Sequence, residues 1–165
     1  MSEITVAAMT PEDIPDVLGL LREFAEYENL LDCLEVDAER LTTALFSDAA
    51  TAEAIIARDG ETPIGYAFFF PNFSSFRGQR GFYLEDIYIR ESARGKGIGE
   101  LMLRHIAKLG ASRGYERIDF LVLDWNTPAI GFYKKLGAVM DESERHSKFV
   151  DSAFSDLAQE RHERH

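Results

Sequence analysis

A glycine-rich turn near the middle of the chain joins a β-like run to a strongly helical one. Glycines stand at positions 95, 97 and 99, directly after the β-like residues 81–90 and at the start of an apolar stripe with helical spacing. Glycines let the backbone curl so that several N–H groups converge, and a helix N-terminus adds partial positive charge at the same point. Arg94 and Lys96 add two full positive charges. The sequence therefore predicts an anion-binding turn.

The spacing of these glycines excludes two common phosphate-binding loops. The segment lacks the nucleotide-binding pattern G-x-x-x-x-G-K-S/T. Only one residue separates Gly97 from Gly99, whereas the dinucleotide fingerprint has two residues at that place. A glycine-rich turn can also be a tight turn with no ligand, so the rest of the chain has to decide between the two interpretations.

The remaining sequence alternates between the periods of strands and helices. Alternating and β-branched runs predict strands at residues 4–8, 52–57, 63–70, 81–90 and 117–123, with shorter β-like runs near Val139 and at residues 148–150. Apolar stripes and capping signals predict helices from Thr10 to Ala25, at residues 37–46, 98–109 and 127–136, and after Asp151. Asp59-Gly60 predicts a hairpin turn. This order predicts an α/β (α+β) fold, a mixed sheet with helices on both faces.

Size and composition predict one cytoplasmic domain over residues 1–165. The length is that of an ordinary domain, and neither a linker-like segment nor a repeat interrupts it. Cys33 is the only cysteine, so no intrachain disulfide can form. No run of about 18 apolar residues is present, which argues against a membrane protein. The four histidines, including His105, His162 and His165, lack metal-ligand spacing, so no metal is predicted.

The net charge of −11 argues against nucleic-acid binding, which depends on clustered Lys and Arg. A strongly acidic surface suits a small cationic partner better. Acidity is also common among proteins that are acidic only for solubility, so charge alone does not identify a substrate.

Several motifs together resemble the GCN5-related N-acetyltransferase (GNAT) superfamily. Arg94-x-x-Gly97-x-Gly99 after a strand is similar to its pyrophosphate-binding motif. Four further segments resemble its polyamine (spermidine/spermine) and thialysine acetyltransferase branch: Phe24-Ala-Glu26-Tyr27-Glu28, Tyr83-Leu-Glu85-Asp86-Ile-Tyr88, Leu123-Asp-Trp125-Asn126-Thr-Pro128 and Gly131-Phe132-Tyr133-Lys-Lys-Leu-Gly137. The resemblance implies a largely antiparallel, twisted sheet and a homodimer. It implies acetyl-CoA as co-substrate and acetyl transfer to the primary amine of a small molecule.

The resemblance also assigns residues to the co-substrate. In the superfamily one strand splays at a bulge, and pantetheine lies along it like an additional strand. The positions that the resemblance implies for cofactor binding are Ile87, Tyr88 and Ile89 for pantetheine, Arg94, Gly95, Lys96, Gly97, Ile98, Gly99 and Glu100 for pyrophosphate, and Asn126.

Two catalytic residues follow from the same resemblance. Tyr133 corresponds to the tyrosine that protonates the departing thiolate, although a purely structural aromatic role is the alternative. Glu85 corresponds to the acidic residue that helps an alkylammonium of pKa about 10 to lose its proton, directly or through water. No acyl-enzyme is needed, because the amine attacks acetyl-CoA in a ternary complex.

The implied acceptor-binding residues are Tyr27, Glu28, Glu85 and Asp86. Neighbouring residues of a strand point to opposite faces, so Glu85 and Asp86 can share one pocket only if the strand bulges. Residues 71–80 lie where the family shapes its acceptor pocket. Their two arginines, Arg77 and Arg80, would bind a substrate carboxylate and favour a lysine analogue such as thialysine over a polyamine, or they are simply solvated. A protein lysine or N-terminal acetyltransferase and a silent CoA-binding sensory module remain alternative functions.

Overall fold

The computed structural model describes residues 3–159, which divide into two compact units. The first unit ends at Leu121 and the second begins at Val122. No helix within residues 3–159 is both long and apolar enough to cross a bilayer. The predicted tail histidines, His162 and His165, lie outside the described residues.

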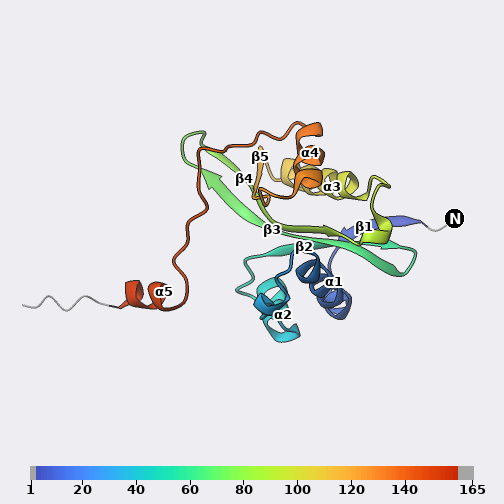
Figure 1. The fold of residues 1–165 in the computed structure, drawn as a ribbon, viewed down its shortest axis with the longest axis horizontal. Helices are drawn as coiled ribbons and strands as arrows, with labels where there is room; N and C mark the ends of the chain where they lie inside the picture. The colour runs from blue at the N-terminus through green and yellow to red at the C-terminus, as the bar shows by residue number, and fades with distance from the viewer. Residues whose placement is uncertain (1–2, 160–165) are drawn as a thin grey trace, which may run out of the picture. The chain divides into compact units, whose positions relative to one another are not determined.

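A single sheet forms the centre of the first unit (Figure 1). The described part of this unit has five strands in sequential order, β1 (Ile4–Ala8), β2 (Glu53–Asp59), β3 (Thr62–Ser74), β4 (Gln79–Ile89) and β5 (Arg117–Phe120). All neighbours are antiparallel except β4 and β5, which are parallel. The turn between β2 and β3 contains Gly60 at a φ of 61°, a conformation that favours glycine. The predicted mixed sheet and its hairpin are confirmed.

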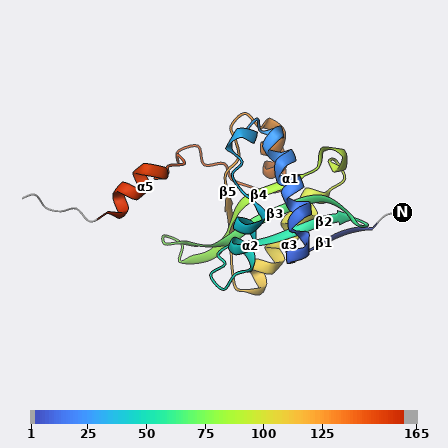
Figure 2. The same cartoon turned by 90° about the horizontal axis from the view of Figure 1, so that it is seen from below.

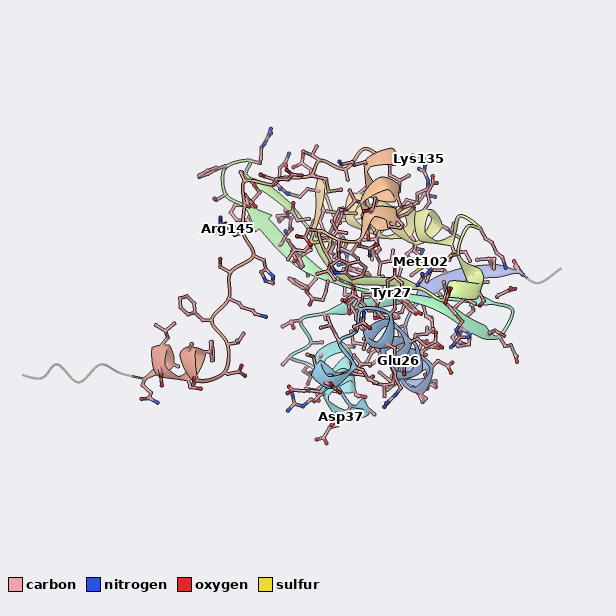
Figure 3. All side chains as sticks on the ribbon, in the orientation of Figure 1. Glu26, Tyr27, Asp37, Met102, Lys135 and Arg145 are labelled. Atoms are coloured by element: carbon pink, nitrogen blue, oxygen red, sulfur yellow. The ribbon has the colours of Figure 1, made fainter. Side chains whose placement is uncertain are left out.

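Helices cover both faces of this sheet (Figures 1 and 2). The helices α1 (Ile14–Tyr27) and α2 (Ala38–Phe46) pack on one face, and α3 (Ile98–Ser112) packs on the other. Figure 3 shows Glu26 of α1 and Met102 of α3 on opposite sides of the sheet. We call the two surfaces the α1 face and the α3 face. The predicted two-sided packing is confirmed.

Local capping explains where α1 and α2 begin. A short 3-10 turn, η1 (Pro11–Asp13), leads directly into α1, and the Asp13 carboxylate accepts hydrogen bonds from the Thr10 N–H at 2.8 Å and from its hydroxyl at 3.2 Å. Asp37 caps α2 by accepting from the Arg40 N–H at 2.8 Å. A second 3-10 turn, η2 (Leu31–Cys33), lies between the helices. Acidic caps of this kind satisfy N–H groups that have no partner within the helix.

The second unit contains α4 (Thr127–Lys135) and α5 (Asp151–Ala158), near the positions predicted from the sequence. The strands predicted near Val139 and at residues 148–150 were wrong, because residues 137–150 form no strand or helix. A β-like run becomes a strand only when another strand pairs with it. The β-like composition of this segment finds no such partner among the described residues.

Candidate functional site

The glycine-rich turn has the conformation that its sequence predicts. After the 3-10 turn η3 (Glu91–Ala93), Gly95 and Gly97 adopt φ angles of 76° and 77°, a left-handed region that strains other residues. Gly97 is the N-cap of α3, so the turn ends at a helix N-terminus. A Cβ added at either glycine would meet no atom within 4 Å, which means that the backbone is open to approach. The turn therefore offers the geometry of an anion site.

The second half of β4 has a free edge. Pairing with β5 extends only from Gly81 to Leu84, whereas pairing with β3 continues to Ile89. Among the described residues, Ile87, Tyr88 and Ile89 therefore have a strand neighbour on one edge alone. An extended ligand can pair with such an edge through main-chain hydrogen bonds. The edge leads directly toward the glycine-rich turn.

A β-bulge at Glu85 sits where the two halves of β4 meet. Leu84 is opposite Phe69 and Asp86 is opposite Phe68, so Glu85 has no opposite residue on β3. Counting from either side of the bulge places Glu85 and Asp86 together on the α1 face. The bulge that lets both carboxylates share one face is therefore present, although neither residue lines the pocket between α1 and the glycine-rich turn.

The carboxylates near the bulge differ in environment. Glu85 is exposed, and Asp86 is half-buried. Burial, followed by the negative charges of Glu85 and Glu28, raises the pKa of Asp86 to about 7. Burial also raises the pKa of Glu28, which follows the last turn of α1. Three acidic groups from two distant parts of the chain thus gather on one face, and we call them the acidic cluster.

Tyr66 lies beside this cluster and was missed by the sequence analysis. It belongs to β3, is fully buried, and its hydroxyl has no hydrogen-bond partner among residues 3–159. The only signal in the sequence was a single tyrosine within an otherwise apolar strand. That pattern usually marks a core aromatic residue.

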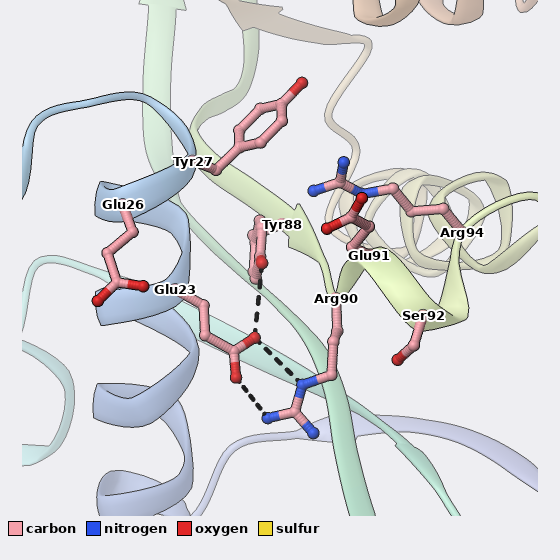
Figure 4. A pocket seen from close by; sticks show the side chains of 8 residues that line it. All are labelled: Glu23, Glu26, Tyr27, Tyr88, Arg90, Glu91, Ser92 and Arg94. Atoms are coloured by element: carbon pink, nitrogen blue, oxygen red, sulfur yellow. Dashed lines mark hydrogen bonds and ion pairs between the residues drawn. The ribbon is translucent and has the colours of Figure 1, made fainter.

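A pocket of about 640 Å³ lies between the C-terminal part of α1 and the start of the glycine-rich turn (Figure 4). Its lining residues are Glu23, Glu26, Tyr27, Tyr88, Arg90, Glu91, Ser92 and Arg94. The Arg94 guanidinium lies 4.6 Å from the centroid of the Tyr27 ring and 5.6 Å from that of Tyr88, and its Nε donates to the Ile89 carbonyl at 2.9 Å. Residues assigned to acceptor and co-substrate therefore meet here.

An ion pair joins two of the residues that line this pocket. Arg90 donates two hydrogen bonds to the Glu23 carboxylate, at 2.8 and 3.1 Å, and Tyr88 contributes a long third one at 3.5 Å. Paired hydrogen bonds of this kind hold a guanidinium in one orientation. The contact ties α1 to the end of β4, next to the free edge.

Arg80 lies on the other side of the sheet from the acidic cluster. Its guanidinium stacks over Tyr115 at 5.3 Å and donates to the Arg113 carbonyl at 3.3 Å. Tyr115 belongs to the apolar packing of the α3 face. Arg80 is thus engaged away from the cluster, whereas Arg77 is exposed in the turn between β3 and β4.

The second unit carries the two remaining predicted site residues. Tyr133 on α4 is buried, and burial raises the pKa of its phenol to about 12. The Asn126 side chain accepts from the Ala129 N–H at 3.4 Å and caps α4. Asn126 therefore has a structural role within its own unit, which the sequence analysis did not anticipate.

Comparison with known proteins identifies the family. A model of the acetyltransferase (GNAT) family matches residues 19–138, well over half of the chain. The chain belongs to this family. It is accordingly an acetyl-CoA-dependent N-acetyltransferase.

Relatives of this acetyltransferase agree with the family match. It is 32% identical over 146 residues to the thialysine N-epsilon-acetyltransferase of Bos taurus, covering 84% of this chain and 85% of the bovine protein. It is 32% identical over 139 residues to the human spermidine/spermine N(1)-acetyltransferase-like protein 1, covering 80% of this chain but 20% of the human protein. An integron cassette protein of V. cholerae superposes with a TM-score of 0.79 at 24% identity, covering 97% and 99% of the two chains, which shows a shared fold.

Residues 3–159 of this acetyltransferase contain no group of three or more His, Cys, Asp or Glu side chains arranged to hold a metal ion. His105, on α3, is half-buried and stands apart from the acidic cluster, because α3 covers the opposite face.

Proposed function

We propose that this enzyme acetylates a primary amine of a small cationic molecule, either a polyamine or diamine or a lysine analogue such as thialysine. The observation that carries the proposal is the acidic cluster at the β4 bulge, where Glu28, Glu85 and Asp86 share one face. A cationic amine is the natural partner of such a cluster. The names of the bovine and human relatives, which refer to thialysine and to spermidine and spermine, support the same substrate class.

The proposed co-substrate site runs from the free edge of β4 to the glycine-rich turn. Ile87, Tyr88 and Ile89 would hold pantetheine through main-chain groups. The turn from Gly95 to Glu100 would hold pyrophosphate, with Arg94 beside it. The open space above Gly95 and Gly97 supports this fit. Asn126 of the second unit is the remaining proposed contact.

Glu85 is the proposed base for the incoming amine. An alkylammonium must lose a proton before its nitrogen can attack the thioester, and an exposed carboxylate can take that proton directly or through water. Asp86, half-buried beside it, is the second proposed contact for the charged substrate. Tyr27, whose ring already lies 4.6 Å from the Arg94 guanidinium, is proposed to line the pocket mouth.

Tyr133 is the proposed acid for the departing thiolate. With a pKa of about 12, its phenol keeps its proton throughout the neutral range. It can therefore donate a hydrogen bond to the sulfur as negative charge develops there. Direct attack in a ternary complex leaves no role for Cys33, which is exposed.

The two compact units are proposed to act as one acetyltransferase domain over residues 1–165. The family match supports this, because residues 19–138 span the boundary at residue 121. A homodimer, a cytoplasmic location and the absence of nucleic-acid and membrane partners remain predictions from the resemblance and the composition.

A direct test measures thiol release from acetyl-CoA with spermidine, spermine, short diamines, lysine, thialysine and a lysine-containing peptide. We expect turnover with at least one free amine and weaker turnover with the peptide. Preference for the peptide would favour a protein acetyltransferase. No thiol release with any compound of the panel, with CoA binding retained, would favour the sensory module and contradict the proposal.

A further inference from the structure

Tyr66 places a polar hydroxyl group within the apolar packing of the α1 face. Its side chain is fully buried, and its hydroxyl forms no hydrogen bond with any residue of the described range 3–159. Leaving a buried hydroxyl unsatisfied costs free energy, and folded proteins rarely do so without a reason. A phenylalanine at this position would fill nearly the same space without that cost.

The surroundings of the hydroxyl indicate what it faces. The Tyr66 ring packs against Phe68 at 5.0 Å and Tyr88 at 6.2 Å between centroids, which places it on the α1 face. Burial raises the pKa of the Tyr66 phenol, and the charges of Asp86 and then Glu28 raise it further. The register of β3 against β4 agrees with this, because Tyr66 is opposite Tyr88 and Phe68 is opposite Asp86, which makes Asp86 the diagonal neighbour of Tyr66 on the α1 face.

The Tyr66 hydroxyl, Asp86 and Glu28 together offer several hydrogen-bond acceptors. Within residues 3–159, neither Asp86 nor Glu28 forms an ion pair or a side-chain hydrogen bond. Carboxylates only accept, and a hydroxyl can accept as well as donate. An ammonium group, with three N–H donors and one positive charge, complements all three.

We propose that the Tyr66 hydroxyl, together with Asp86 and Glu28, binds the non-reacting ammonium of a dicationic acceptor. The inference rests on the proposed function and names a specificity-determining residue for it. An ammonium between two carboxylates keeps its proton, so it cannot be the attacking nitrogen. Exposure falls from Glu85 to Asp86 to Tyr66, so the reacting amine belongs at the open Glu85 end and the second charge at the buried end.

The test compares Tyr66→Phe with Tyr115→Phe, a matched change on the α3 face. Each enzyme is assayed with 1,3-diaminopropane and with propylamine, the latter as substrate or as inhibitor of diamine acetylation. For Tyr66→Phe, kcat/KM for the diamine should fall about 10- to 100-fold, mainly through KM, because a hydrogen bond to a charged group is lost. Propylamine and acetyl-CoA parameters should not change, and Tyr115→Phe should resemble wild type.

Calorimetric titration with 1,3-diaminopropane gives a second readout that does not need turnover. The Kd should rise by a similar factor in Tyr66→Phe, while the midpoint of thermal unfolding stays equal or rises. If the wild type acetylates no amine but the Kd still shifts, the proposed function fails and the ammonium site stands.

Two results would overturn the inference. An equal loss for diamine and monoamine would place the hydroxyl at the reacting nitrogen. An active wild type with no change in Tyr66→Phe would mean that the hydroxyl bonds only to water. If Tyr66→Phe lowers stability, calorimetric titrations with 1,3-diaminopropane and with propylamine, run well below its thermal midpoint, decide the matter: only the Kd for the diamine should rise, and an unchanged Kd overturns the inference.

Discussion

The two halves of β4 differ in almost every physical respect, although they form one continuous strand. From Gly81 to Leu84 the strand is paired on both edges, and Phe82 and Leu84 are buried in the apolar core of the α3 face. From Glu85 onward one edge has no strand neighbour among residues 3–159, a bulge breaks the alternation, and the carboxylates face the side proposed to bind the amine. The first half contributes to the stability of the core. Within the described residues, the second half lacks a strand neighbour on one edge, which leaves main-chain and acidic groups exposed. The division falls at a single residue, Glu85.

Phe82→Ala should have the largest effect and tests the structural half. The ring is fully buried between Phe69 and Tyr115, at 4.8 and 5.0 Å between centroids. Its loss leaves a cavity, so the free energy of unfolding should fall by about 3–5 kcal/mol in a denaturant titration. Phe73→Ala, at an exposed position of the same hairpin, is the control and should change stability little. A small effect of Phe82→Ala would contradict the conclusion that the first half of β4 is its stabilising half.

Glu85→Gln tests the functional half. The change keeps the shape of the side chain and removes the proposed base, so kcat should fall about 100-fold while the thermal midpoint stays constant. Steady-state kinetics with the best amine of the panel provides the measurement. Glu116→Gln, an exposed residue just before β5, should leave kcat unchanged. Full activity of Glu85→Gln would show that Glu85 is not the base, and Asp86 would be the next candidate.

Gly97→Ala extends the test to the turn beyond the free edge. The left-handed φ of 77° costs an alanine roughly 1–2 kcal/mol, and relief of that strain distorts the N-terminus of α3. KM for acetyl-CoA should therefore rise about tenfold, with a smaller change in KM for the amine. Gly131→Ala, within α4 and with open space at its Cβ, is the control. An unchanged KM for acetyl-CoA would contradict the proposed pyrophosphate site.

Asp86→Asn should have the smallest effect, which is a change in how the free energy of unfolding depends on pH. The folded pKa of about 7 lies above the unfolded value near 3.8, so the native state binds more protons between these pH values. Asp86 therefore lowers stability progressively as pH rises through that window. The variant should gain about 1.4 kcal/mol relative to wild type between pH 6 and pH 8, measured by denaturant titration at both. A constant difference would mean that Asp86 is not perturbed.

Local signals in the sequence predicted the elements and the conformation of the glycine-rich turn. Periodicity and the Asp59-Gly60 turn predicted the hairpin, and the glycine spacing before Ile98 predicted a turn into a helix N-terminus. These features depend on neighbouring residues, so a short window contains the information. The short β-like runs near Val139 and at residues 148–150 failed because strand formation also needs a pairing partner.

Tertiary structure alone decided how the candidate site is assembled. Only the register of β4 against β3 put Glu85 and Asp86 on one face, and only packing by α1 brought Glu28 close enough to raise the Asp86 pKa. Tyr66 looked like any core aromatic until its hydroxyl proved to lack a partner among the described residues. Register and burial arise from contacts between residues far apart in the chain, and no local pattern records them. The sequence by itself determined which side chains and turns were available, and the long-range pairing of strands decided which of them meet.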